Sequence, residues 1–150
     1  LFCAKSVTNC RSAMEPFTHE IRFHVRYAET DAMGIVHHSS YIVWFEEGRS
    51  SYMRAIGFPY AEVEKAGYYF TVTEVHARYL APAKYDEEIS LFTRVGELKS
   101  RGLRFEYEVR RAADGQLLVS GYTEHICIDH AGAVRRIPAE IMAHFRREKR

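Results

Sequence analysis

The segment from residue 27 to residue 41, YAETDAMGIVHHSSY, gathers the groups best suited to chemistry. Ahead of a run with helical periodicity it holds a carboxylate, a glycine and two imidazoles, at Asp31, Gly34, His37 and His38. The first backbone N–H groups of a helix lack partners within the helix and carry the positive end of its dipole, so they stabilise an oxyanion well. A nearby aspartate can attack a carbonyl carbon or activate water, which suits acyl transfer. The alternative is an aspartate that only forms a turn.

The composition excludes several classes of partner. The 21 Lys and Arg residues nearly balance the 20 Asp and Glu residues, which leaves a formal net charge of +1. Nucleic-acid binding usually depends on a clustered basic surface, so no nucleic-acid partner is expected. No apolar run approaches the roughly 20 residues that a membrane-spanning helix needs, and residues 1–26 lack a signal-peptide core. Three cysteines leave one unpaired in any disulfide scheme, which favours a reducing, cytoplasmic location.

No residues show the spacing of a metal or cofactor site. His19 and His24 resemble a zinc protease pair, but zinc ligands on a helix are four residues apart, and these lie five apart on an alternating stretch. The sequence has no C-x-x-C pair, no G-x-G-x-x-G and no P-loop, and it lacks the G-x-S-x-G motif of serine hydrolases. Neither a metal nor an organic cofactor is therefore expected.

The elements around the reactive segment follow from the hydrophobic pattern. Strict alternation over residues 19–27 predicts a strand, and residues 28–36 break the alternation as a loop. Ser39 and Ser40 are both able to cap a helix of about four turns. Its apolar positions recur at steps of three or four: Tyr41, Trp44, Phe45, Gly48, Tyr52 and Ile56. Val43 widens this apolar face, so the helix should be covered on more than one side.

The remainder of the chain predicts a short helix, four strands and a closing helix. These fall at residues 60–66, 69–80, 88–95, 103–111, 117–128 and 139–145. Asp114-Gly115 is a typical hairpin turn, so the last two strands should pair antiparallel, and the four strands should form a meander. Segregated helices and strands indicate an α+β fold, with a five-stranded antiparallel sheet wrapped around the long helix. Because open sheet edges need cover, a partner subunit should pair there.

Residues 1–16 are predicted to be a flexible leader ahead of a single domain at residues 17–147. The first 13 residues have no hydrophobic period and no acidic residue, and Met14 is a candidate start. A basic, serine-containing stretch also resembles a transit peptide, but this one is short, so a start-site artefact is the favoured interpretation.

The reactive segment also matches a known family. The pattern Y-x-x-T-D-x-x-G-I-V-H-H-x-x-Y-x-x-W-F-E, over residues 27–46, resembles the signature of the 4-hydroxybenzoyl-CoA thioesterase family, including its YbgC-type acyl-CoA thioesterases. The similarity continues through Tyr79-x-x-Pro82 and covers about residues 20–145. This family has the hotdog fold, in which an antiparallel sheet wraps around a long central helix, in agreement with the elements predicted above.

The resemblance implies roles for individual residues of the segment. It places the catalytic aspartate at Asp31, with Gly34 shaping the turn that brings the carboxylate to the thioester. The backbone N–H that polarises the thioester carbonyl falls on His38, at the start of the core helix. In YbgC-like members a tyrosine and a histidine at the positions of Tyr27 and His38 line the active site. His37 matches no family role and is expected in solvent or in packing.

The resemblance also implies substrate contacts elsewhere in the chain. In the family a basic cluster after the third strand contacts the nucleotide phosphates of coenzyme A, and here Lys99 and Arg101 occupy that place. Ser100 stands where a further basic residue is expected, so a merely solvated hairpin is the alternative. Glu46 on the core helix is expected to line the acyl pocket, with a plain surface position as its alternative.

The sequence therefore predicts a cofactor-free acyl-CoA thioesterase that releases a free acid and CoA, with Asp31 as nucleophile or as base for water. The acyl group, aromatic or of short or medium chain, stays open, as does acyl carrier protein in place of CoA. A homodimer or homotetramer is expected. The alternatives are a hotdog module that binds acyl-CoA or an acylated carrier without hydrolysis, a structural dimer without an acyl ligand, and a hotdog dehydratase, whose pattern is not evident here.

Overall fold

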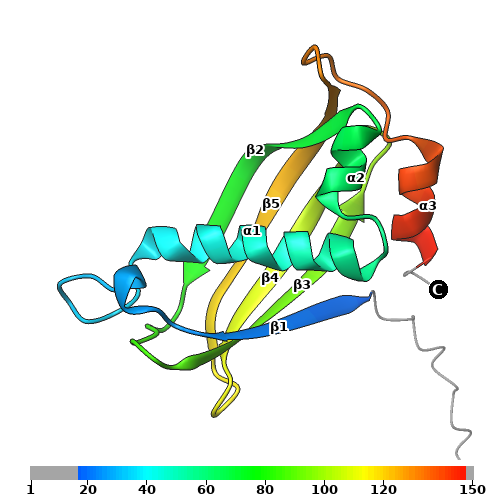
Figure 1. Cartoon of the computed structure of the whole chain (residues 1–150). Helices are drawn as coiled ribbons and strands as arrows, with labels where there is room; N and C mark the ends of the chain where they lie inside the picture. Colours follow the sequence, from blue (N-terminus) through cyan, green and yellow to red (C-terminus); the bar gives the residue numbers. More distant parts are fainter. Residues whose placement is uncertain (1–16, 148–150) are drawn as a thin grey trace, which may run out of the picture.

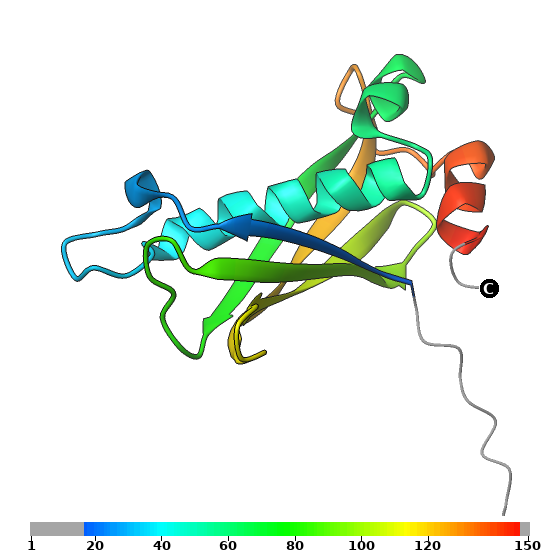
Figure 2. The ribbon, with the colours of Figure 1, turned by 60° about the horizontal axis from the view of Figure 1, so that its bottom comes forward.

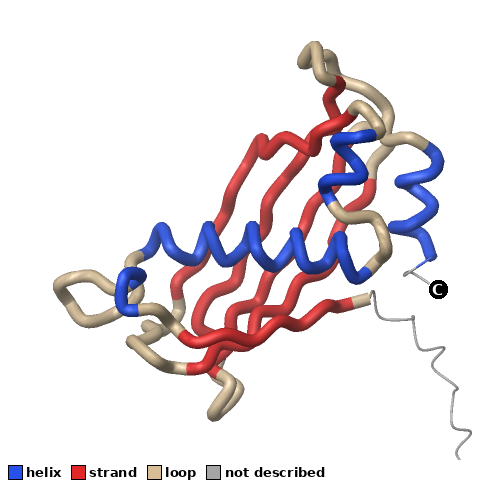
Figure 3. Tube along the Cα trace, in the orientation of Figure 1, coloured by secondary structure: helices blue, strands red, loops and turns tan. Residues whose placement is uncertain are grey.

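Five antiparallel strands curl around one long helix, α1, which lies against one face of the sheet (Figures 1 and 3). The computed structural model describes residues 17–147, so the predicted leader at residues 1–16 lies outside the described residues. The elements are β1 (Thr18–His24), the 3-10 turn η1 (Tyr27–Glu29), α1 (His38–Ala55), α2 (Tyr60–Lys65), β2 (Tyr68–Tyr79), β3 (Glu88–Leu98), β4 (Gly102–Arg111), β5 (Leu117–Asp129) and α3 (Ala139–Arg147). The predicted α+β class is confirmed. No helix among residues 17–147 combines the length and hydropathy needed to cross a membrane.

The strands follow the order β1-β3-β4-β5-β2, and all neighbours run antiparallel. The expected pairing of β4 with β5 is confirmed, with Gly115 in the turn at φ +73°. The expected four-strand meander was wrong, because β2 pairs with β5 and not with β3. The connection from β2 to β3, residues 80–87, is too long for a two-residue hairpin, and its backbone forms hydrogen bonds with other segments of the chain. Val36, just before α1, donates its N–H to the Ala83 carbonyl at 2.9 Å.

The core lies between α1 and the inner face of the sheet. The Phe45 ring is nearly parallel to the Tyr107 ring of β4, with centroids 4.3 Å apart, and Trp44 meets Phe23 of β1 edge-on at 5.1 Å. Phe45 and Trp44 are both buried, as the hydrophobic period predicted. Val43, on the outward side of α1, is 60% exposed. The described chain therefore does not supply the second covered side that was expected for this helix.

A chain of hydrogen bonds crosses this otherwise apolar layer. The hydroxyls of Tyr107 and Thr123 are 2.7 Å apart, and Oγ1 of Thr123 lies 2.7 Å from Nε2 of His125. Burial, with a smaller contribution from the Arg49 guanidinium, lowers the pKa of His125 to about 4. The imidazole is therefore neutral at pH 7, and its Nε2 is matched with a hydroxyl rather than left unpaired.

At Gly48, α1 approaches β3 very closely. A Cβ atom on Gly48 would lie 2.5 Å from Oγ1 of Thr93 and 2.9 Å from Cδ2 of Leu91. Alanine favours a helix over glycine by about 1 kcal/mol, but crowding a packed core costs about 1–3 kcal/mol. We expect Gly48→Ala to lower the free energy of unfolding, measured by urea denaturation, by up to about 2 kcal/mol, since crowding outweighs propensity.

Thr93→Ala is the matched relief of this crowding. The Thr93 hydroxyl is buried and has no hydrogen-bond partner in the described part of the chain, so its removal alone should change stability little. In the Gly48→Ala background the same substitution should recover part of the lost free energy of unfolding. If Thr93→Ala changed the free energy of unfolding by the same amount in the unchanged protein and in Gly48→Ala, the crowding explanation would be contradicted.

Candidate active site

Residues 30–36 form a short hairpin before α1, here called the Asp31 hairpin. Thr30 and Val36 form a β-bridge, and Asp31 donates its N–H to the Ile35 carbonyl at 2.9 Å. Gly34 donates its N–H to the Asp31 carbonyl at 2.9 Å and has φ at +75°, a conformation that favours glycine. The hairpin projects from one end of the molecule in both ribbon views (Figures 1 and 2).

The Asp31 carboxylate is held through one of its two oxygens. Oδ1 accepts the N–H of Met33 at 2.8 Å, an Asx turn that fixes the direction of the side chain. Oδ2 accepts no hydrogen bond from any described residue, and Asp31 as a whole is half-buried. A carboxylate oxygen in this state keeps its lone pairs for a carbonyl carbon or for a water molecule.

The residue that caps α1 is His37, and not Ser39 or Ser40 as predicted. Its Nδ1 accepts the Ser39 N–H at 3.2 Å and lies 2.8 Å from the Ser39 hydroxyl. The serine prediction was wrong because the imidazole already takes the capping position two residues before Ser39, with extended backbone. His37, expected in solvent or packing, is thus exposed and has a definite structural role.

His38, the first residue of α1, has a backbone N–H with no acceptor among residues 17–147. The neighbouring N–H groups are all engaged. That of His37 donates to the Glu29 carbonyl, that of Ser39 to the His37 ring, and that of Ser40 to the His37 carbonyl. The His38 N–H is therefore an available donor at the positive end of the helix dipole, which is where an oxyanion is stabilised.

The Asp31 hairpin sets the distance between these two groups. His38 follows Ile35, the residue opposite Asp31, by three residues. Three residues of extended backbone span about 10 Å. A reacting carbonyl needs its carbon about 3 Å from the attacking oxygen and its oxygen about 3 Å from the donor nitrogen. The chain between the two groups is therefore long enough to place one thioester group between them.

Glu29 fastens the hairpin to α1, a role that no sequence pattern indicated. Its Oε1 accepts the indole N–H of Trp44 at 2.9 Å, and its main-chain carbonyl accepts the His37 N–H at 2.8 Å. The sequence shows only that an acidic residue stands two positions before Asp31. Its partner, the Trp44 indole, lies 15 residues farther along the chain, so the contact cannot be inferred from the local pattern.

Tyr27 lies on η1 at the base of the hairpin, and not at the end of β1 as predicted. β1 ends at His24, because the side chain of Glu29 accepts the Arg26 N–H at 2.8 Å and turns the chain into η1. The Tyr27 side chain is 78% exposed and meets the Tyr85 ring edge-on at 5.6 Å.

Tyr79, at the end of β2, joins the start of α1 to the edge of the sheet. Its hydroxyl donates to the His38 carbonyl at 2.9 Å, and its ring meets the Tyr41 ring at 5.5 Å. The sequence placed Tyr79 on a strand but gave no sign of this contact, which joins residues 41 positions apart.

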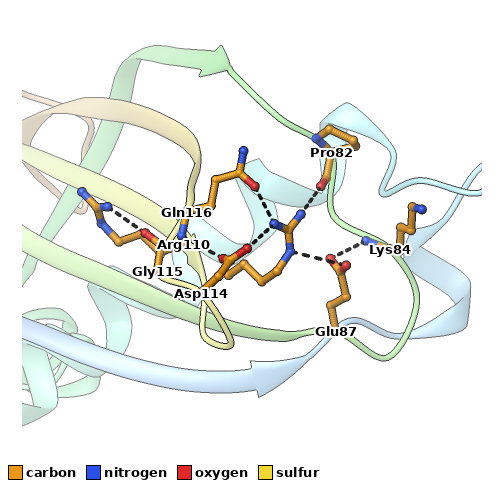
Figure 4. A network of polar contacts seen from close by, with 8 residues as sticks. Pro82, Lys84, Glu87, Arg110, Asp114, Gly115 and Gln116 are labelled. Carbon is orange, nitrogen blue, oxygen red and sulfur yellow. Dashed lines mark hydrogen bonds and ion pairs between the residues drawn. The ribbon is translucent and has the colours of Figure 1, made fainter.

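A network around Arg111 supports the connection on which the hairpin rests (Figure 4). One Arg111 nitrogen donates to the Pro82 carbonyl at 3.2 Å, and Nε lies 3.4 Å from Oε1 of Glu87. Another nitrogen reaches Asp114 at 3.1 Å and Gln116 at 2.5 Å, both in the β4–β5 turn. The connection between β2 and β3 is thereby held to the body of the sheet.

The structure does not bring every predicted site residue together. Glu46 is exposed on α1, and Lys99 and Arg101 lie at the β3–β4 turn. That turn adjoins α3 beyond the C-terminal end of α1, a helix of 18 residues that spans about 27 Å. Lys99 lines a groove of about 770 Å³ there with three cations that the sequence did not single out: Arg136, Arg146 and Arg147. Within the described range no cluster of three or more His, Cys, Asp or Glu side chains is arranged to hold a metal ion.

The chain is similar to known proteins in sequence. The model of the thioesterase-like superfamily matches residues 25–145. The chain belongs to this superfamily. The acyl-CoA thioesterase YbgC of Haemophilus influenzae is 30% identical over 124 residues, which cover 81% of this chain and 89% of that one. The family resemblance seen in the sequence is confirmed.

Solved structures of similar sequence have the same fold. The hypothetical protein TT1821 of Thermus thermophilus is 41% identical, with a TM-score of 0.81 and coverage of 87% of this chain and 96% of that one. The DHNA-CoA thioesterase of Staphylococcus aureus is 31% identical, with a TM-score of 0.76 and coverage of 88% and 87%. The predicted hotdog fold is confirmed.

The capping role of His37 is testable through stability. His37→Ala removes the side chain that accepts the Ser39 N–H, so it should lower the free energy of unfolding by about 1 kcal/mol. His37→Asn keeps a capping acceptor and should restore most of the loss. Urea denaturation of the three proteins measures both effects. Identical stability of the alanine and asparagine variants would rule out the cap.

Proposed function

We propose that this protein hydrolyses acyl-CoA thioesters to a free carboxylic acid and CoA. The single observation that supports the proposal is that an Asp31 oxygen on the hairpin and the His38 N–H just after it both lack a hydrogen-bond partner among the described residues. The name of the Haemophilus influenzae relative, an acyl-CoA thioesterase, supports the same activity.

The reaction needs only groups that the chain supplies. The His38 N–H donates a hydrogen bond to the negative charge that develops on the thioester oxygen, and the Asp31 carboxylate acts on the carbonyl carbon or on the attacking water. In the nucleophilic route the carboxylate displaces the CoA thiolate, which takes up a proton, and water then hydrolyses the mixed anhydride. In the general-base route Asp31 removes a proton from water as that water attacks, and the thiolate leaves with the proton. Both routes consume one water and release the acid and CoA.

Other residues are proposed to shape the site around the reacting carbonyl. Gly34 supports this through its positive φ, since it turns the chain just beyond Asp31. Tyr27 and the His38 ring are exposed near the hairpin, where they can line the entry for the thioester. Glu46, exposed one turn beyond Tyr41 on α1, is proposed to line the acyl pocket.

The nucleotide end of CoA is proposed to bind at the groove beside α3. Lys99 lines this groove with Arg136, Arg146 and Arg147, and the three arginines form no ion pair with any described residue. Guanidinium groups suit phosphate oxygens because they donate two parallel hydrogen bonds. Arg101 is exposed at the same turn.

The separation of the groove from Asp31 supports a site shared by two copies of the chain. Within one copy the two lie beyond opposite ends of α1, about 27 Å apart or more. β2 is an open edge strand with exposed apolar side chains, among them Val72 and Val75. Antiparallel pairing of two copies along β2 brings the partner's β3–β4 turn to the end that carries the Asp31 hairpin. Three strand spacings, roughly 15 Å, then separate the groove from the shared edge, a gap that a pantetheine arm can cross.

The role of Asp31 is tested by Asp31→Asn, which keeps the shape and removes the basic oxygen. We expect kcat to fall by at least about 100-fold with the fold unchanged. CoA release is followed with a thiol reagent on a panel of aromatic, short-chain and medium-chain acyl-CoAs, beside a thioester of acyl carrier protein. Undiminished turnover by the variant would remove Asp31 from the mechanism. Binding of acyl-CoA without turnover by the unchanged protein would favour the non-catalytic module.

The shared site is tested at the centre of β2. Val75→Glu places like charges together across the paired edges, so it should convert the dimer to a monomer and abolish most turnover. Light scattering measures the mass, and the thiol assay measures the activity. Val134→Glu is the control, because Val134 is also exposed, at 51% against 44% for Val75, but lies outside the edge strand β2. A monomer that keeps full activity on acyl-CoA would contradict the shared site.

A further inference from the structure

Both oxygens of the Glu29 carboxylate form hydrogen bonds at the base of the Asp31 hairpin. Oε1 accepts the Trp44 indole N–H at 2.9 Å, and Oε2 accepts the Arg26 N–H at 2.8 Å. The Arg26 guanidinium approaches Oε1 at 3.2 Å. The side chain is only 12% exposed, so these bonds are partly shielded from water. Both carboxylate oxygens are therefore engaged within the protein.

The main chain of Glu29 bonds to the opposite arm of the Asp31 hairpin. Its carbonyl accepts the His37 N–H at 2.8 Å and lies 3.4 Å from the Ser40 hydroxyl. One residue therefore contacts the turn before the hairpin, the cap of α1 and, through Trp44, the second turn of α1.

The attachment point on α1 is rigid. Trp44 is 3% exposed and packs edge-on against Phe23 at 5.1 Å and against Tyr41 at 4.7 Å. Because the Trp44 indole is fixed in the core, its hydrogen bond to Glu29 fixes the position of the Glu29 side chain relative to the core. The ion pair with Arg26 adds little, because the Arg26 side chain is 72% exposed.

We propose that Glu29 is a positioning residue that sets the distance and direction of the Asp31 carboxylate relative to the His38 N–H. Glu29 is two residues before Asp31 on one arm, and its carbonyl holds His37, the residue before His38, on the other. Each reacting group is thus within two residues of a Glu29 contact. Because a displacement of about 1 Å can cost about 100-fold in rate, loss of this attachment should slow the chemical step. This inference rests on the proposed thioesterase function.

The test compares Glu29→Ala and Glu29→Gln with the unchanged protein. We expect Glu29→Ala to lower kcat about 10–100-fold while KM for acyl-CoA changes less than about twofold, because the substrate contacts stay in place. Glu29→Gln keeps an acceptor for the indole and should retain an intermediate kcat. Glu47→Gln is the control: Glu47 is an acid on α1 whose one ion-pair partner among residues 17–147 is the exposed Arg54, so this variant should leave kcat unchanged.

Combination with Asp31→Asn separates positioning from general stability. A residue that acts through Asp31 has little left to affect once the carboxylate is gone, so Glu29→Ala should not lower the residual rate of Asp31→Asn further. Trp44→Phe, which removes the indole donor and keeps most of the ring volume, should reproduce the kcat loss if Glu29→Ala fails to fold.

The outcomes are distinguishable. A folded Glu29→Ala with the kcat of the unchanged protein, or a kcat loss that adds in full to that of Asp31→Asn, would overturn the positioning role while leaving the thioesterase intact. A rise in KM with unchanged kcat would overturn it as well. If the unchanged protein fails to release CoA from any thioester, the proposed function fails and this inference falls with it.

Discussion

The contact between α1 and the inner face of the sheet is the constraint on which the rest of the structure depends. Gly48 allows the helix to lie against Thr93 and Leu91, and Phe45 stacks on Tyr107 farther along the same face. A helix held this closely cannot slide or rotate over the strands, so its two ends are fixed in space. Its start is placed at the end of β2, where the Tyr79 hydroxyl bonds to the first turn, and its end is placed beside α3.

The candidate site uses this fixed helix start as a reference point. The tip of the hairpin before α1 is exposed, so its geometry depends on hydrogen bonds to better-packed neighbours. Those bonds come from three directions: the cap at His37, the indole of Trp44 and the connection at Ala83 that Arg111 supports. The hairpin is thus anchored at its base by these bonds and by the buried Val36, while its tip stays exposed.

The features that the sequence predicted well are those set by local periodicity. Alternation located the strands, and the helical recurrence of Trp44 and Phe45 identified the helix and its buried face. The position of Gly34 at a turn was also readable, because few other residues adopt its positive φ. The fold class then followed from the order of the elements, and the reactive segment stood out by residue type.

The features that the sequence did not predict depend on partners far along the chain. β2 lies beside β5 because of pairing over about 50 residues, and no local signal specifies such a neighbour. The helix cap is His37, although serine is usually preferred at that position. The contacts of Glu29 and Tyr79 form only when α1 has packed on the sheet. The roles of Asp31, His38, Tyr27 and Glu46 in catalysis or binding rest on geometry and resemblance, and they stay proposals.

The buried, neutral imidazole of His125 affects the stability of the fold at low pH. His125 binds its proton at about pH 4 when folded, whereas an unfolded chain offers a histidine that binds at about pH 6.5. Between these values the unfolded chain takes up more protons, so acidification through this window favours unfolding, by on the order of 3 kcal/mol at its lower limit. Above about pH 6.5 the full stabilisation is present. The same histidine that forms a buried hydrogen bond at neutral pH thus lowers the stability of the folded protein as the pH falls.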